Sequence, residues 1–143
     1  MGHFTKKAVF IIYYMMVHFS VICQTNTDTA DTRKWIFVGN GNGGIPYYIQ
    51  SKCLEKKDGI VTIMTKSIQP IFKKSGKVYK DVEVEIMYGV DCKNKLMITL
   101  TGMVSTKDDI LVYKAYTEKE QKWETNAKNS IGEVILEAVC QRF

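Results

Sequence analysis

Apolar and polar residues alternate most regularly between residues 82 and 87. The even-numbered positions hold Val82, Val84 and Ile86, whereas the positions between them are mainly acidic. A period of two is typical of an antiparallel strand with one buried face. Segments rich in β-branched and aromatic residues predict five further strands, at residues 35–38, 45–50, 59–68, 95–105 and 109–117.

Short polar turns separate these segments and indicate hairpins. They are Lys57-Asp58-Gly59, Lys74-Ser75-Gly76-Lys77, Lys93-Asn94 and Lys107-Asp108-Asp109. Strands and helices do not alternate along the chain, which argues against a parallel sheet. The pattern therefore predicts an antiparallel meander of about six strands.

The last segment has a different period. Ser130 and Glu133 form a capping box, in which Glu133 would also reach back to the amide of Ser130. A single apolar stripe follows, consisting of Ile131, Val134, Ile135, Ala138 and Val139. So short a helix is marginal alone, so it should pack on one face of the sheet. We expect an α+β domain over residues 34–143.

The first 23 residues resemble a secretory signal peptide. Lys6 and Lys7 precede an apolar run of 15 residues (8–22), and a polar spacer follows at residues 24–33. A membrane-spanning helix usually needs about 20 apolar residues, although a retained amino-terminal anchor is the alternative. Cleavage can fall after Cys23, or Cys23 can be a lipidated cysteine, for which Ile22 is a poor preceding residue.

Export would remove both histidines, His3 and His18, from the mature domain. It would thereby exclude catalytic triads that use histidine, and it would remove the commonest metal ligand. Net charge would fall from +5 to +3, too little to indicate a nucleic-acid-binding protein. The sequence contains no catalytic constellation, and we predict a protein that is not an enzyme.

Three other motifs have structural explanations. Residues 39–44 (GNGNGG) match the spacing of a dinucleotide loop, but a strand follows them rather than a helix. Glu83 and Glu85 are better explained as the solvated face of a strand, and Asp108 and Asp109 as a turn. We therefore expect no cofactor and no metal ion.

Lysines gather near two of the predicted turns. If both turns lie at the same end of the sheet, the lysines would form one basic rim able to meet acidic partners. Its members would be Lys56, Lys57, Lys73, Lys74, Lys77 and Lys80.

Three cysteines follow residue 23, and disulfides are expected in an exported protein. Spacing alone does not select a pair among Cys53, Cys92 and Cys140. The residue left over would be a free thiol, and a thiol-dependent enzyme using Cys53 is the corresponding alternative function.

Several motifs together resemble the surface-adhesin protein E family of bacterial exported proteins. They are KWIFVG…YYIQ, VDCKN, the tryptophan at Trp123 and the closing SIGEVILEAVC, and they span residues 34–140. The resemblance implies a six-stranded antiparallel sheet crossed by a carboxy-terminal helix. It also implies a disulfide between Cys92 and Cys140, which leaves Cys53 as the candidate free thiol.

The resemblance implies adhesion to host extracellular-matrix proteins, from the periplasm, the outer-membrane surface or outside the cell. The alternative is a periplasmic inhibitor or binding module. Membrane attachment is expected only if Cys23 carries lipid. An exposed sheet edge could also pair with a second copy of the chain to give a homodimer.

Overall fold

The computed structural model describes residues 34–143. The predicted signal peptide, the polar spacer and the candidate lipidation site at Cys23 lie outside the described residues.

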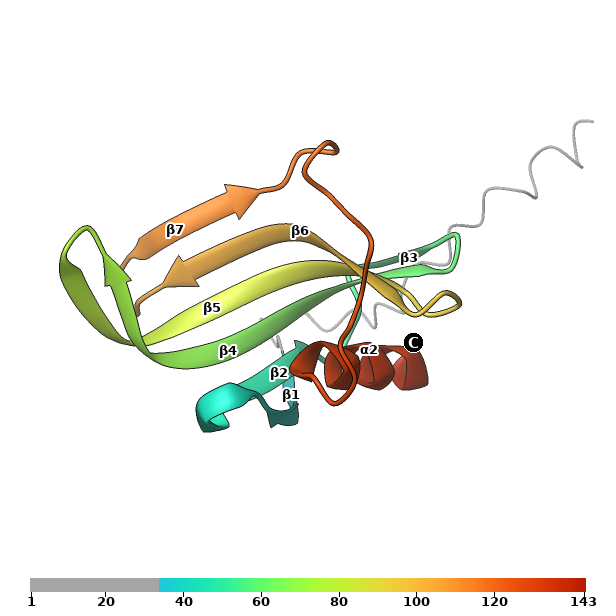
Figure 1. The fold of residues 1–143 in the computed structure, drawn as a ribbon, viewed down its shortest axis with the longest axis horizontal. Helices are drawn as coiled ribbons and strands as arrows, with labels where there is room; N and C mark the ends of the chain where they lie inside the picture. The colour runs from blue at the N-terminus through green and yellow to red at the C-terminus, as the bar shows by residue number, and fades with distance from the viewer. Residues whose placement is uncertain (1–33) are drawn as a thin grey trace, which may run out of the picture.

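The described chain folds into one antiparallel sheet and one helix (Figure 1). Six strands follow chain order across the sheet, and two short strands pair at its margins, β3 with β4 and β8 with β6. In chain order the strands are β1 (Trp35–Asn40), β2 (Pro46–Gln50), β3 (Glu55–Lys57), β4 (Ile60–Lys74), β5 (Lys77–Asp91), β6 (Leu96–Ser105), β7 (Ile110–Ala115) and β8 (Glu124–Thr125). The predicted α+β meander with a carboxy-terminal helix is therefore confirmed.

Two of the connecting turns depend on backbone conformations that favour glycine at their second position. Asp58 and Gly59 have φ of 51° and 81°, and Ser75 and Gly76 have φ of 49° and 76°. Positive φ at both central residues marks the tight hairpin turn that matches the twist of antiparallel strands. The third turn is held by Asp91, whose Oδ1 accepts hydrogen bonds from the amides of Lys93 and Asn94, each at 3.0 Å.

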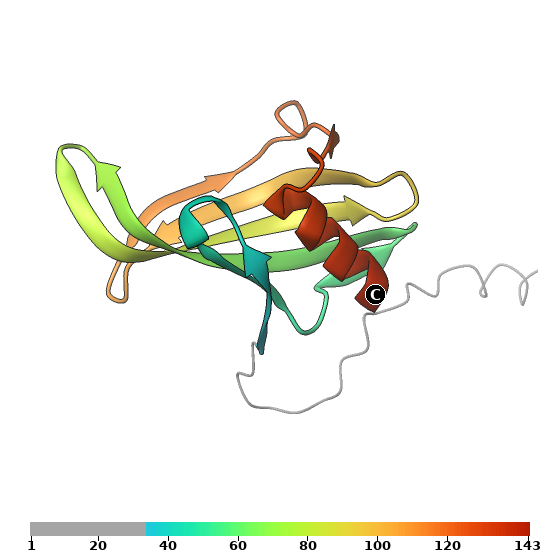
Figure 2. The same ribbon diagram turned by 60° about the horizontal axis from the view of Figure 1, so that its bottom comes forward.

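Helix α2 (Ile131–Arg142) lies across one face of the sheet (Figure 2). It buries Ile135, Leu136 and Val139. The sheet contributes the fully buried aliphatic residues opposite them, Ile49, Val61, Ile63 and Val90. The helix stripe predicted from the sequence omitted Leu136. This residue lies one turn before Cys140, on the side of the helix that the disulfide holds against the sheet, and it is buried there.

The helix begins at Ser130, whose hydroxyl accepts the amide of Glu133 at 3.2 Å. The return contact differs from the predicted one. Glu133 accepts from the amide of Asn129 at 2.5 Å, while the amide of Ser130 donates to the carbonyl of Ala127. Asn129 has a φ of 60°, which turns its amide toward the Glu133 carboxylate.

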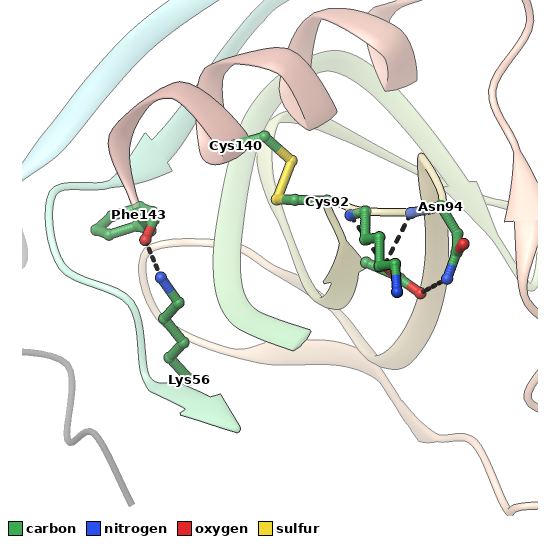
Figure 3. Close-up of a disulfide and its surroundings, with 7 residues drawn as sticks. Lys56, Cys92, Asn94, Cys140 and Phe143 are labelled. Atoms are coloured by element: carbon green, nitrogen blue, oxygen red, sulfur yellow. Dashed lines mark hydrogen bonds between the residues drawn. A yellow bond between two sulfur atoms is a disulfide. The ribbon is translucent and has the colours of Figure 1, made fainter. Parts of the chain in front are cut away.

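Two contacts tie the carboxy-terminal end of α2 to the sheet (Figure 3). Cys140 in its last turn is bonded to Cys92, directly after β5, with 5.4 Å between the Cα atoms. The ammonium of Lys56 on β3 donates to the carbonyl of Phe143. The disulfide implied by the resemblance is thus present.

Candidate functional site

The β4–β5 hairpin extends beyond the rest of the sheet. Pairing of β2 with β4 ends at Ser67, and pairing of β5 with β6 begins at Glu83. Residues 69–82 therefore form a two-stranded projection, called here the hairpin arm, which is paired from Gln69 with Val82 to Lys74 with Lys77. Figures 1 and 2 show it curving away from the sheet.

Pro70 and Asp81 mark where the arm bends. Proline has no amide to donate and is tolerated where a strand lacks a second neighbour, as β4 does there. The facing residue, Asp81, has a φ of 51°. At the base of the bend Val82 is fully buried. Beside the turn at the tip, the ammonium of Lys74 donates to the carbonyl of Leu111 on β7. The arm therefore contacts the rest of the domain at its base and, through Lys74, beside its tip.

The surface of the arm combines positive charge with exposed aliphatic groups. It carries four lysines, Lys73, Lys74, Lys77 and Lys80, against one acidic residue, Asp81. Ile71 and Val78 are 60% and 56% exposed. Exposed aliphatic residues beside cations are suited to contact with an acidic partner. The lysines are evident in the sequence, whereas these two aliphatic residues were not predicted, although the apolar residues that continue past Ile68 could have indicated them.

The predicted rim of six lysines is wrong. Lys56 and Lys57 lie on β3, which pairs with the first residues of β4, whereas the arm lies at the opposite end of β4. The 15 residues of that strand separate the two groups. Lys56 is also engaged with Phe143. Only the four lysines of the arm remain together.

The sheet face opposite α2, called here the open face, carries several aromatic residues. Tyr48 is paired with Lys66, and Lys66 alternates with the buried residues of β4, so both point away from the helix. The Phe37 and Tyr48 rings meet edge to face at 5.7 Å between centroids, and the Lys66 ammonium lies 4.9 Å from the centre of the Trp35 ring. The open face is thus a second surface able to contact a protein.

The two carboxylates singled out in the sequence also lie on the open face. Glu85 is paired with Lys66, and Glu83 forms an ion pair with the same lysine at 3.8 Å. They lie on the solvated face of a strand, as predicted.

The glycine-rich segment forms the loop of a hairpin. It leads from β1 through the short 3₁₀ turn η1 (Asn42–Gly44) into β2, and the amide of Gly41 donates to the carbonyl of Ile45. Gly43 and Gly44 have φ of 71° and 74°. Because no helix begins here, the loop lacks the helix amino terminus that a phosphate site uses.

Asp108 and Asp109 form a turn, as predicted, with both amides donating to the hydroxyl of Thr106. Within residues 34–143, no group of three or more histidine, cysteine, aspartate or glutamate residues could hold a metal ion.

Cys53 is not the free thiol that the sequence suggested. It is 6% exposed, belongs to the hydrophobic core and is disulfide-bonded. Cys92 and Cys140 bond each other, so neither of them is the partner of Cys53. A bonded, buried sulfur cannot act as a nucleophile, because the thiolate is the reactive form.

Disulfides persist in oxidising compartments, so Cys92–Cys140 indicates a location outside the cytoplasm. None of the helices within residues 34–143 is long and apolar enough to span a membrane. Comparison of the chain with protein-family models, with curated proteins and with solved structures gives no match.

Proposed function

We propose that this chain is an exported, non-enzymatic binding domain whose hairpin arm contacts an acidic protein. By its resemblance to the surface-adhesin protein E family, the partner would be a host extracellular-matrix protein. The domain would act in the periplasm, at the outer-membrane surface or outside the cell. The disulfide between Cys92 and Cys140 supports such a location.

The observation that carries the proposal is the composition of the arm. A two-stranded projection has no structural need for two exposed aliphatic residues, and exposing them costs solubility. Ile71 and Val78 lie close to the lysines along the same hairpin. The cations would speed encounter with an acidic surface, and the aliphatic side chains would supply contact area once the partner is bound.

The test compares two triple variants with equal change of charge. Lys73→Glu/Lys77→Glu/Lys80→Glu reverses the arm but spares Lys74, which donates to Leu111. Lys57→Glu/Lys119→Glu/Lys128→Glu reverses three exposed lysines elsewhere. Binding to immobilised laminin, fibronectin and collagen would be measured at low and high salt.

We expect saturable binding by the wild type, weaker at high salt because exposed charges are screened. The arm variant should lose at least about tenfold in affinity, equivalent to about 1.4 kcal/mol, and the control variant should retain it. Equal losses in both variants would show that only net charge matters. The proposal would be contradicted if the affinity were the same at low and high salt and in the arm variant.

A homodimer is a separate proposal about the sheet edges. β1 and β7 are the outermost strands of the six-strand path, and outermost strands leave backbone groups unpaired. Light scattering at micromolar concentration should then give twice the mass of one chain. A monomeric mass would refute pairing through either edge.

A further inference from the structure

A polar pocket lies between the sheet and the beginning of α2. Its volume is about 270 Å³, and its sheet side is formed by Tyr88, Met97 and Thr99. The segment after β7 supplies the other walls, and Gly132 closes it at the helix. This pocket, called here the α2 pocket, is separate from the hairpin arm, so it can be tested independently of the proposed function.

Strand alternation decides which side chains reach the α2 pocket. Glu124 on β8 is paired with Met97, so both point toward α2. Lys122, two residues earlier in the chain, also lines the pocket. Trp123, between them, points to the open face, where its ring lies 3.6 Å from the position that a Cβ on Gly89 would take. A cation and a carboxylate thus stand side by side at the pocket.

Asn126 provides the strongest indication of a ligand. Its Nδ2 is buried and has no hydrogen-bond partner, although buried amide groups are nearly always paired. Its Oδ1 lies 2.1 Å from the position that a Cβ on residue 132 would occupy. Only glycine at residue 132 leaves room for this placement. An unpaired donor is therefore held at the pocket wall, where a bound molecule could accept from it.

The pocket remains a mixture of donors and acceptors over a wide pH range. Burial raises the pKa of Tyr88 to about 12, so its hydroxyl stays neutral and can donate. Glu120 lies at the same pocket with its carboxylate engaged by Lys114 at 3.0 Å and by Thr117. The charges of Lys114 and Glu120 cancel, and those of Lys122 and Glu124 balance.

This arrangement disfavours charged ligands. A carboxylate placed near Asn126 would also face Glu120 and Glu124, and an ammonium placed near Glu124 would face Lys122 and the Asn126 donor. A hydroxyl group both accepts and donates, so it matches neighbouring donors and acceptors at once. Tyr88 and Tyr116 add aromatic wall, against which the apolar faces of a small ring can pack.

We propose that the α2 pocket binds a neutral sugar residue, with a sugar hydroxyl accepting from Asn126 Nδ2. The probes are D-glucose, D-galactose, D-mannose and N-acetyl-D-glucosamine, added to the folded domain with its disulfides intact. Methylammonium and acetate serve as charged small probes. Amide chemical-shift mapping by NMR gives both the location and the affinity.

We expect at least one sugar to shift the amides around Tyr88, Asn126 and Gly132 saturably, and the charged probes not to do so. Asn126→Ala and Tyr88→Phe should each weaken binding by about tenfold. The matched controls Asn40→Ala and Tyr113→Phe lie outside the pocket and should bind as the wild type does.

Gly132→Ala gives an independent check that keeps the helix. The added Cβ would displace the Asn126 side chain, so sugar binding should fall while the helical circular dichroism is retained. The proposal fails if no sugar shifts these amides, if the Asn126 and Tyr88 variants bind as tightly as the wild type, or if only the charged probes bind. Loss of matrix-protein binding in the arm variant would leave this result unaffected.

Discussion

Cys92, which directly follows β5, is bonded to Cys140 in the last turn of α2, so the final element of the chain is fixed to the central strands of the sheet. The two residues are 48 positions apart. The bond therefore closes a long loop, and it does so where the helix would otherwise be held only by one apolar face and the Lys56 contact.

Removing this bond should destabilise the domain considerably. In the chain-entropy model, a loop of this length corresponds to about 4 kcal/mol, which is an upper estimate. We expect Cys92→Ala/Cys140→Ala to lower the free energy of unfolding by about 2–4 kcal/mol in urea titrations. An unchanged midpoint would mean that packing alone holds α2 in place.

Two glycines in neighbouring strands should respond oppositely to alanine. At Gly89 a Cβ would lie 2.8 Å from the Ile98 side chain and 3.6 Å from the Trp123 ring, whereas nothing lies within 4 Å of a Cβ at Gly102. Gly89→Ala should cost about 1–3 kcal/mol through overpacking. Gly102→Ala should be neutral or stabilise by up to about 1 kcal/mol.

Thermal unfolding of both variants, together with Trp123 fluorescence in a Trp35→Phe background, would check this pair. Only Gly89→Ala should change the emission, because its Cβ would contact the indole. Equal effects on stability at the two positions would contradict the close approach of Ile98 to Gly89, and unchanged emission of Gly89→Ala would contradict the contact with Trp123.

Two isoleucines of β4 differ in burial because one lies in the core and the other in the hairpin arm. Ile63 is fully buried, whereas Ile71 is 60% exposed. Ile63→Ala should therefore cost about 2–5 kcal/mol, and Ile71→Ala less than about 0.5 kcal/mol. Denaturant titrations of the two variants provide the measurement. A large cost at Ile71 would show that the arm is part of the folding core rather than a binding surface.

Glu120 makes stability depend on acid pH. The Thr117 amide, the Lys114 ammonium and the Thr117 hydroxyl lower the pKa of its carboxyl to about 2, from 4.5. Because the folded pKa is depressed, the stabilising contribution is present above about pH 4.5 and is lost as the pH falls toward 2.

Glu120→Gln should consequently lower the melting temperature slightly at neutral pH, and its difference from the wild type should vanish near pH 2. Glu118→Gln, at an exposed neighbour, serves as the control and should match the wild type throughout. A difference that persists unchanged in strong acid would refute the assigned role of the carboxylate.

The chain pattern predicted much of the fold because its elements have clear periods and turn residues. The alternation at Val82, Val84 and Ile86 and the Ser75-Gly76 turn are local features that the structure retains. The predicted strand at residues 59–68 was too short. Proline usually interrupts a strand. Pro70, however, lies where β4 has only β5 beside it, so its missing amide removes no hydrogen bond to a second neighbouring strand.

The candidate sites were predicted less well than the fold. The six lysines could be grouped only by assuming that two turns lie at the same end of the sheet. The length of β4 decides whether they do, and the sequence does not show it. Cys53 was predicted to be a free thiol because it had no partner once Cys92 and Cys140 were paired, and a count of cysteines does not show which of them are bonded. Asn126 has no sequence signature, because only the fold shows that its Nδ2 is buried and unpaired.

The sequence by itself determined six of the eight strands, their antiparallel order, the capped helix and the need for that helix to cover a sheet face, since these follow from hydrophobic period and turn chemistry within short windows. Tertiary structure decided which lysines stand together, which face Trp123 takes and where the α2 pocket forms. These depend on register and on contacts between residues far apart in the chain, such as Gly89 with Trp123, and no local pattern encodes such distances.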